Sequence, residues 1–231
     1  MHEIYENFIK NNPNYSGIEH RCNICGYRFS RFLNFNKLKP REGRCPVCDS
    51  LERHRHLAIH LFSIYPFLKG KKILHFAPEK IIKNILLDSE GEYFDADIDE
   101  KKARYKVDIT NIFFQDDMFD YIICIHVLEH ILDDIKALSE LYRVLKPNGI
   151  AFLSVPYRNE LFEDYSITLP KEREKFYGKS DHVRNYDFKT FLSRIKNAGF
   201  NIKVSYSSKQ SDFFKDCKLG DDIVLAKKII F

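Results

Sequence analysis

The chain has 231 residues, of which 44% are hydrophobic and 30% are charged, and its formal net charge is +4. Its 20 Phe and 13 Tyr supply a packed core, and its 9 Gly and 8 Pro are too few for a low-complexity chain, which excludes a disordered or fibrous protein. No apolar run approaches the roughly 18 residues that a membrane span needs, and the N-terminus lacks the apolar stretch of a signal peptide. We therefore expect a cytoplasmic protein without a membrane span, with one ordinary domain and a small extra module.

Basic residues concentrate in the first 71 positions, which hold 12 Lys and Arg against 6 Asp and Glu, a balance of +6. The rest of the chain is close to neutral, with 25 basic against 27 acidic residues. Such a surplus favours an anionic partner such as a phosphate, a nucleotide sugar or a nucleic acid, but it is small enough to be a solvated surface, and we prefer the second interpretation.

Residues 1–50 carry two Cys-x-x-Cys pairs separated by 19 residues, namely Cys22, Cys25, Cys45 and Cys48. This spacing is typical of a four-cysteine zinc site, in which each pair forms a tight knuckle and the two knuckles complete a tetrahedron. Protein ligands would fill all four positions and leave none for water. The sequence therefore predicts a small zinc ribbon with a structural zinc ion.

Residues 51–71 should connect this module to the rest of the chain. Apolar residues recur at helical spacing from Leu51 to Tyr65, with Ser50 as the predicted N-cap. We expect the basic residues of this helix, Arg55 and His56 among them, to form a solvated face.

Residues 72–231 alternate short apolar strands with amphipathic helices, the pattern of a mostly parallel α/β sheet. We predict strands at 73–77, 92–98, 105–109, 121–127, 150–155, 202–207 and 223–228, and helices at 133–146 and 188–198. Pro147, Asn148 and Gly149 should turn the first helix into the next strand. The long segment at about 156–187 is expected to be a lid or an acceptor-binding insertion.

Acidic residues follow two of the predicted strands. Ligands bind at the carboxyl ends of parallel strands, near the point where the strand order reverses. Asp97 follows the second strand and suits the two hydroxyls of a ribose. Asp108 follows the third and can accept a hydrogen bond from an exocyclic amine such as that of adenine.

The stretch at 107–149 carries the motifs of a known family. Val-Asp-Ile-Thr at 107–110 is followed by Phe-Asp-Tyr-Ile-Ile-Cys at 119–124, His-Val-Leu-Glu-His at 126–130 and Leu-Tyr-Arg-Val-Leu-Lys-Pro-Asn-Gly at 141–149. From Lys72 to its end, the chain resembles a class I S-adenosylmethionine-dependent methyltransferase of the small-molecule type. The resemblance implies a Rossmann-like, mostly parallel sheet with an antiparallel last strand. It also implies that Asp97 holds the ribose of S-adenosylmethionine, Asp108 and Ile109 bracket the adenine, and Ile125 and His126 lie beside the sulfonium.

The first strand departs from the family's pattern. That strand normally ends in an acidic residue followed by a glycine-rich loop, because glycines let the backbone approach the cofactor. Here His75 replaces the acid, and Ala77, Pro78 and Glu79 stand where glycines are expected. Since Ala77 is small and Glu79 can provide a carboxylate for the cofactor's α-ammonium, we expect His75, Ala77 and Glu79 to form an altered binding loop.

Two histidines are candidate bases for methyl transfer to a hydroxyl. His126 ends the fourth predicted strand and has the basicity that neutral pH requires, although capping or packing at a helix start is an equally good interpretation. We expect His130 to pack against the core. The insertion supplies His182 as a second base, with Tyr157, Asp181 and Arg184 as substrate-binding candidates, although a plain surface loop is an equally good interpretation.

The sequence thus predicts a methyltransferase that uses S-adenosylmethionine to methylate an oxygen or nitrogen of a small acceptor, an anionic metabolite or a glycan precursor included. The zinc-headed arrangement also resembles a branch of methyltransferases associated with glycan-related pathways. One alternative is an RNA methyltransferase whose basic zinc module grips nucleic acid through residues such as Arg28, Arg31 and Arg44. Another is a non-catalytic binding protein on a degenerate methyltransferase fold.

Overall fold

The computed structural model describes residues 2–35 and 41–229. Contacts divide the chain into two compact units. The N-terminal unit contains residues up to Phe67 together with Glu79–Ser89 and Ser205–Ile223, and the sheet unit contains Leu68–Pro78, Glu90–Val204 and the chain from Val224 onward. The predicted boundaries were 1–50, 51–71 and 72–231. The connecting helix and two segments of the predicted methyltransferase domain therefore group with the four-cysteine module.

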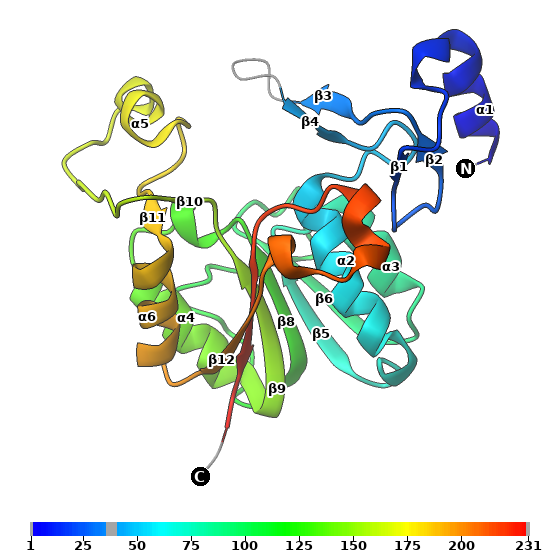
Figure 1. The fold of residues 1–231 in the computed structure, drawn as a ribbon. Helices are drawn as coiled ribbons and strands as arrows, with labels where there is room; N and C mark the ends of the chain where they lie inside the picture. The colour runs from blue at the N-terminus through cyan, green and yellow to red at the C-terminus, as the bar shows by residue number, and fades with distance from the viewer. Residues whose placement is uncertain (1, 36–40, 230–231) are drawn as a thin grey trace. The chain divides into compact units, whose positions relative to one another are not determined.

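Seven strands form the central sheet, each at a predicted position (Figure 1). They are β5 (Lys72–Phe76), β6 (Glu92–Asp97), β7 (Tyr105–Lys106), β8 (Phe119–Ile125), β9 (Leu145–Ser154), β12 (Asn201–Ser205) and β13 (Ile223–Lys227). The fold class is confirmed: an α/β sheet that is mostly parallel with an antiparallel strand near one edge.

The strand order is β12-β13-β9-β8-β5-β6-β7. Strand β5 pairs in parallel with β6 on one side, where Ile73 faces Tyr93, and with β8 on the other, where Ile73 faces Tyr121. Strand β13 runs antiparallel to β9, with Leu225 opposite Phe152. The chain thus leaves β5 toward one edge and later returns to place β8 on its other side. The carboxyl ends of β5 and β8 are where a fold of this type binds its ligand.

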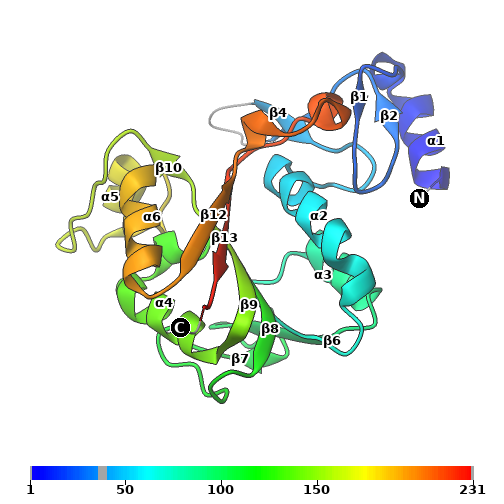
Figure 2. The same ribbon diagram turned by 60° about the horizontal axis from the view of Figure 1, so that its bottom comes forward.

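Two helices, α4 (Asp134–Val144) and α6 (Phe188–Asn197), lie on the same side of the sheet (Figure 2). Each begins at an aspartate whose side chain accepts a hydrogen bond from the first turn, Asp133 from the Lys136 N–H and Asp187 from the Thr190 N–H, both at 2.9 Å. Their apolar faces join the buried core of the sheet, to which they contribute Leu138, Leu141, Val144, Phe191 and Ile195. Across the described residues, no helix combines the length and apolar character needed to cross a bilayer.

The turn predicted at 147–149 lies inside a strand. Helix α4 ends at Val144, and Leu145 already has an extended backbone and pairs with Phe119 of β8. Asn148, with φ of +64°, lies within β9, and the register with β8 shifts next to Phe119. The Pro-Asn-Gly sequence therefore produces an irregularity in β9, because strand pairing starts directly after the helix.

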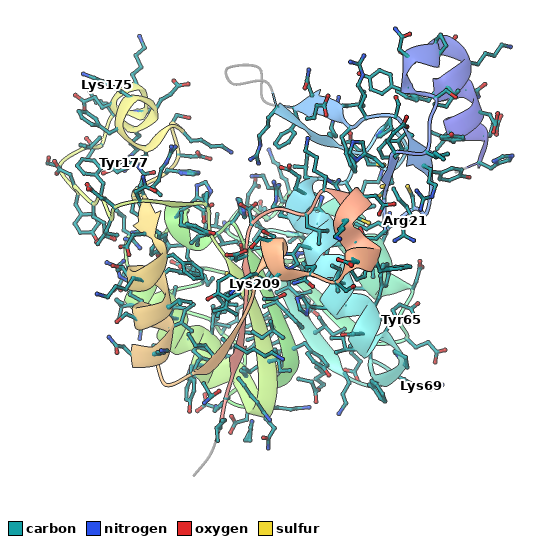
Figure 3. All side chains as sticks on the ribbon, viewed as in Figure 1. Arg21, Tyr65, Lys69, Lys175, Tyr177 and Lys209 are labelled. Carbon is teal, nitrogen blue, oxygen red and sulfur yellow. The ribbon has the colours of Figure 1, made fainter. Side chains whose placement is uncertain are left out.

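The segment at 156–187 forms a separate lobe of the sheet unit. Strands β10 (Tyr157–Arg158) and β11 (Tyr186–Asp187) pair in parallel at its two ends, and α5 (Pro170–Tyr177) lies between them. Figure 3 labels Lys175 and Tyr177 on α5. The Tyr177 side chain is buried and its hydroxyl donates to the Asp164 carbonyl at 3.0 Å, so side-chain packing fixes the lobe internally.

The N-terminal unit contains two short antiparallel hairpins, three α-helices and several 3-10 turns. The hairpins are β1 (His20–Arg21) with β2 (Arg28–Phe29), and β3 (Leu33–Phe35) with β4 (Arg41–Arg44). The helices are α1 (His2–Asn11), α2 (Glu52–Ile64) and α3 (Lys80–Leu87), and the 3-10 turns are η1 (Pro13–Tyr15), η2 (Tyr65–Phe67), η4 (Ser207–Lys209) and η5 (Asp212–Cys217). Figure 3 shows Arg21 of β1, whose guanidinium lies 4.0 Å from the centre of the Phe213 ring of η5.

The expectation of a solvated basic face on α2 is wrong for two of its residues. Arg55 and His56 are fully buried. The Arg55 guanidinium donates to the carbonyls of Gly43 and Ser50, both at 2.8 Å, and of Cys217 at 2.6 Å. One buried cation thus joins the four-cysteine module, the start of α2 and the segment around Cys217, which explains why residues 205–223 belong to this unit.

Ser50 is also not the N-cap of α2. The helix begins one residue later than predicted, and the Leu51 N–H donates to His54 Nδ1 at 3.1 Å. Ser50 is instead fully buried, with its Oγ 3.3 Å from Cys22 Sγ and from Cys48 Sγ. Its hydroxyl therefore contacts the cysteine cluster and does not cap the helix.

Candidate functional site

A cavity of about 650 Å³ lies at the carboxyl ends of β5, β6 and β8, within the sheet unit. Its volume is typical of a small-molecule site. Five residues that the sequence singled out for cofactor binding or catalysis lie around it, together with one substrate-binding candidate: Ala77, Asp97, Asp108, Ile109, His126 and Asp181. The topology therefore brings together side chains that are spread over more than a hundred positions of the sequence.

The Asp97 and Asp108 carboxylates are each held by a local hydrogen bond. Asp97 Oδ1 accepts from the Asp99 N–H at 2.9 Å, and Asp108 Oδ1 accepts from the N–H and the hydroxyl of Thr110, both at 2.8 Å. In the described part of the chain, no protein hydrogen bond occupies the second carboxylate oxygen of either residue. Both carboxylates thus have a fixed orientation and a free acceptor, as recognition of a diol or an amine requires.

Two cavity residues have left-handed backbones. Ala77 follows β5 with φ of +47°, and His126 follows β8 with φ of +56°. The Ala77 N–H donates to the Ala96 carbonyl at 2.9 Å, and the His126 N–H donates to the Ser154 carbonyl at 2.8 Å, so neighbouring strands hold both bends. Non-glycine residues with positive φ are strained, and such strain gathers at ligand sites. Ala77 therefore makes the bend for which related proteins are expected to use glycine.

The structure does not support the predicted role of Glu79 as a partner for the cofactor's α-ammonium. Its carboxylate contacts the Arg53 guanidinium, and its Oε2 lies 2.7 Å from His54 Nε2. Burial alone would raise the pKa of Glu79, but hydrogen bonding to His54 and Arg53 lowers it to about 2. These contacts within the N-terminal unit already neutralise the carboxylate, so it is not available for the cofactor's α-ammonium.

His75 and Ile125 are buried. His75 Nδ1 lies 3.0 Å from the Tyr93 hydroxyl, a contact between the neighbouring strands β5 and β6. Among the described residues, those that line the cavity include neither His75 nor Ile125. The structure thus gives both a place in the sheet core, and their direct contact with a cofactor stays a prediction.

Arg184 lies in a buried charge cluster, not on the cavity. Its side chain is fully buried, with Nη1 2.8 Å from Asp134 Oδ2 and Nε 2.7 Å from Glu163 Oε1. Arg194 of α6 contacts the same two carboxylates at 2.6 and 2.7 Å. The prediction that Arg184 binds a substrate anion is therefore not supported, because two acids inside the protein already pair with it. Tyr157 is 43% exposed and packs against Phe188, and its role stays a prediction.

His130 lines the cavity, so the expectation that it packs against the core is wrong. It ends the 3-10 turn η3 (Leu128–His130), which is separated from the end of β8 by two residues. Its neighbour Glu129 is 1% exposed, with Oε1 3.7 Å from His126 Nδ1 and 3.9 Å from His130 Nε2. The buried His182 ring is perpendicular to that of His130, at a centroid distance of 4.7 Å. Glu129 belongs to the His-Val-Leu-Glu-His motif at 126–130, whose His-x-x-Glu-His spacing was the signal in the sequence for this group, but no role was predicted for it.

The four cysteines of the N-terminal unit form two knuckles with the same hydrogen bonds. The Cys22 carbonyl accepts from the Gly26 N–H at 2.8 Å, and the Cys45 carbonyl accepts from the Asp49 N–H at 3.1 Å. Gly26 and Asp49 both have positive φ, of +80° and +64°. In each knuckle the first cysteine's N–H also donates to the carbonyl five positions later. The two Cys-x-x-Cys sequences thus fold into matching turns that direct their thiols toward one point.

The four sulfur atoms lie within 4.8 Å of one another. Cys22 Sγ is 3.6 Å from Cys48 Sγ, and Cys25 Sγ is 3.7 Å from Cys45 Sγ. Hydrogen bonding to Cys25 lowers the pKa of Cys22, whereas hydrogen bonding to Cys22 raises the pKa of Cys25 and of Cys45. Thiols this close cannot all ionise without a cation between them. A tetrahedral zinc ion, bound by four thiolates at about 2.3 Å, fits this donor set.

Comparison with known proteins gives the family. A sequence profile described as a methyltransferase domain matches residues 41–204, more than half of the chain. The chain belongs to this methyltransferase domain family. The resemblance drawn from the motifs at 107–149 is thereby confirmed.

Two curated relatives of this methyltransferase domain illustrate its range. The sterol 24-C-methyltransferase of Schizosaccharomyces pombe is 31% identical over 201 residues, which span 76% of this chain and 50% of that enzyme. A ubiquinone biosynthesis O-methyltransferase of Pseudomonas putida is 26% identical over 113 residues, 46% of this chain and 47% of that enzyme. The chain spans about half the length of these relatives.

Solved structures show the same fold at low sequence identity. The phosphoethanolamine N-methyltransferase 2 of Haemonchus contortus, solved with S-adenosyl-L-methionine, matches with a TM-score of 0.56 at 14% identity, over 77% of this chain and 53% of that one. A chain from a Haloferax volcanii complex between a methyltransferase activator and a methyltransferase matches with a TM-score of 0.55 at 15% identity, over 78% of this chain and 91% of that one. These likenesses confirm the Rossmann-like class I methyltransferase fold.

Proposed function

We propose that this chain is an S-adenosylmethionine-dependent methyltransferase that methylates an oxygen or a nitrogen of a small molecule. The observation that carries the proposal is the cavity in which Asp97, Asp108, Ile109 and His126 meet at the carboxyl ends of the strands. Asp97 would hold the ribose, and Asp108 with Ile109 the adenine. Family membership supports this arrangement, and the free carboxylate oxygens of both aspartates fit it.

S-Adenosylmethionine would supply a methyl group already activated by its sulfonium. When bound, it would give this methyl group to the acceptor's lone pair, with the electron pair of the carbon–sulfur bond left on sulfur and S-adenosylhomocysteine as the product. The protein chiefly aligns the acceptor with the methyl group. A hydroxyl acceptor must also lose its proton, and we assign His126, at the cavity end of β8, as the base that takes it.

The acceptor class follows from the family and from the charges around the cavity. The relatives are named for a sterol and for ubiquinone biosynthesis, which are both small-molecule chemistry. The argument for an anionic acceptor loses its support, because Arg184 pairs with Asp134 and Glu163. The cavity lining holds four acids against one lysine, Lys102, which favours a neutral acceptor such as a sugar or another hydroxyl compound; the acids are Asp97, Asp108, Asp133 and Asp181.

The basic N-terminal unit gives little support to the RNA alternative. Arg28 Nη1 lies 3.1 Å from Asp216 Oδ2, Arg44 Nη1 lies 3.3 Å from Asp49 Oδ1, and the Arg31 guanidinium lies over a tyrosine ring. Two of the three arginines expected to grip phosphates thus have carboxylate partners, which reduces the charge available to a nucleic acid.

We further propose that Cys22, Cys25, Cys45 and Cys48 bind one structural zinc ion. The convergence of the four thiols supports a closed site, in which no position is left for a substrate. Its role would be to fold the two hairpins, whose core is built from Phe29, Phe32 and Val47 around the cysteines.

The test is an acceptor screen with S-adenosylmethionine labelled in its methyl group. Protein-free metabolite extract and total RNA are offered separately, and S-adenosylhomocysteine release and the labelled product are measured. We expect turnover with the small-molecule fraction only, and its loss in Asp97→Ala but not in Asp212→Ala, an exposed aspartate far along the chain. Label that enters only RNA would support the RNA alternative, and no turnover with either fraction would support the non-catalytic one.

A further inference from the structure

The chain carries a second group of metal-ligand side chains beside the cavity. Glu129, His130 and His182 each offer one ligand atom, and these atoms lie within 4.8 Å of one another. Glu129 and His130 come from η3 after β8, whereas His182 comes from the lobe at 156–187. The Val183 N–H donates to the Glu129 carbonyl at 2.9 Å, so a backbone hydrogen bond holds the two segments together at this point.

Glu129 is the observation that points to a ligand. Its side chain is 1% exposed, and its Oε2 has no hydrogen-bond partner among the described residues. A buried carboxylate oxygen without a partner is costly, because it has lost its hydration. Burial raises the pKa of Glu129, but a protonated carboxyl would still bury a donor and an acceptor. A cation bound by this carboxylate would offset this cost.

His130 is oriented as a metal ligand would be. Its Nδ1 lies 3.1 Å from the Asp181 carbonyl oxygen and 3.6 Å from Asp181 Oδ2. Since a carbonyl can only accept, Nδ1 carries the proton, and in the neutral ring Nε2 has the lone pair. That Nε2 is the nitrogen that faces Glu129 Oε1 at 3.9 Å. Metal-bound histidines commonly donate their other N–H to a carbonyl or carboxylate in this way.

His182 is kept in the form that can bind a metal. Its ring is almost fully buried against that of His130, at a centroid distance of 4.7 Å and an interplanar angle of 86°. Burial lowers its pKa to about 4, so the imidazole is neutral at pH 7.

We propose that Glu129, His130 and His182 bind a divalent transition-metal ion at the edge of the cavity. Two imidazoles and one carboxylate are the donors of open metal sites, which keep positions for water or substrate. With bonds of about 2.1 Å, neighbouring ligand atoms lie roughly 3.0–3.4 Å apart. The separation of 3.9 Å between Glu129 Oε1 and His130 Nε2 would therefore contract by roughly 0.5–0.9 Å on binding.

The open positions give the ion a role that rests on the proposed function. His126 and His130 both line the cavity, so an acceptor hydroxyl bound there can reach the ion. Coordination would lower the pKa of that hydroxyl and fix its oxygen for transfer. The hydroxyl proton would be transferred to His126, which is the base proposed above. No redox change is involved.

The test is metal binding by the full-length chain, measured with and without substitutions. Protein is dialysed against excess zinc, then against zinc-free buffer, and zinc per chain is determined. We expect about two ions in the wild type and about one in Glu129→Gln and in His182→Ala. Glu160→Gln and His2→Ala, the same changes at exposed positions, should leave about two ions.

Cobalt distinguishes the two sites by spectrum. At the cysteines Co²⁺ gives thiolate charge-transfer absorption, whereas at Glu129, His130 and His182 it gives only weak visible bands. We expect Glu129→Gln to remove the second signal and keep the first, with cobalt affinity at this site weakened at least 10-fold. A wild type with the cysteine-bound ion alone, or a Glu129→Gln variant that binds as the wild type does, would overturn the proposal.

A parallel titration with S-adenosylhomocysteine separates this proposal from the proposed function. Cofactor binding without the second ion would contradict only the proposed metal site. A second ion without cofactor binding would contradict the proposed methyltransferase activity and support the metal site.

Discussion

Ala77 and His126 occupy a backbone conformation that glycine adopts more easily, at the two strand ends that meet in the cavity. The sequence showed only that the glycines were missing after the first strand. It could not show that the bend survives without them, because the hydrogen bond from Ala77 to Ala96 depends on the pairing of β5 with β6. A small side chain at position 77 is thus what the cavity requires.

Substitutions at Ala77 test this requirement. Glycine relieves the strain but adds freedom to the unfolded chain, so we expect Ala77→Gly to change the free energy of unfolding by less than about 1 kcal/mol and to keep S-adenosylhomocysteine binding. A β-branched residue cannot adopt this φ without strain, so Ala77→Val should cost about 2 kcal/mol and weaken binding. Urea unfolding measures the free energy of unfolding and calorimetry measures S-adenosylhomocysteine binding, with Ala103→Val as the control. Unchanged binding in Ala77→Val would contradict the role of the bend.

Glu79 makes the N-terminal unit sensitive to acid. Its pKa falls from 4.5 to about 2 in the folded protein, where it contacts Arg53 and His54. A carboxyl whose pKa is lower in the folded than in the unfolded state stabilises the fold. This contribution is fully present above pH 4.5 and is lost as the pH falls toward 2. We expect Glu79→Gln to be roughly 2 kcal/mol less stable than the wild type at pH 7, and the difference to shrink between pH 5 and pH 2. A difference that stays constant over this range would rule out the ion pairs as its source.

At the scale of elements, the two cysteine knuckles are short turns with little core of their own. We expect the hairpins to depend on a metal ion, since the apolar cluster around them contains few side chains besides the cysteines. We expect about one zinc ion per chain to survive a brief EDTA wash. This ion should be lost in Cys25→Ser but kept in Cys124→Ala, because Cys124 lies in the core of the sheet. Reduced, folded protein without metal would disprove the zinc site.

The lobe at 156–187 is tied to α4 and α6 by the buried cluster of Arg184, Arg194, Asp134 and Glu163. Removal of Arg184 would leave two buried carboxylates to share a single cation, Arg194. We therefore expect Arg184→Met to lower the free energy of unfolding by about 3 kcal/mol. Lys175→Met, an exposed lysine of the same lobe, should change it by less than about 0.5 kcal/mol. Equal effects of the two substitutions would show that the cluster does not hold the lobe.

At the scale of the whole molecule, the sheet was predictable because each strand and helix has its own local pattern. Short apolar runs located the seven strands, and hydrophobicity with a period of 3.6 residues located the helices α4 and α6. The order of the acids after the strands located Asp97 and Asp108. The short-range Cys-x-x-Cys spacing likewise located the knuckles.

Contacts between distant segments were not predictable. Arg55 seemed a surface residue until the fold placed the Gly43 and Cys217 carbonyls around it. Glu79 and Arg184 carried charges that suit a ligand, but partners elsewhere in the chain pair with them. The meeting of His182 with Glu129 depends on how the lobe packs against η3, which no local pattern encodes.

The most direct test of the proposed function is a calorimetric titration of the full chain with S-adenosylhomocysteine. We expect saturable binding in the micromolar range, about −8 kcal/mol, weakened more by Asp97→Ala than by His126→Ala. Absence of binding by folded, zinc-loaded protein would contradict the proposed cofactor site and favour a binding protein on a methyltransferase fold.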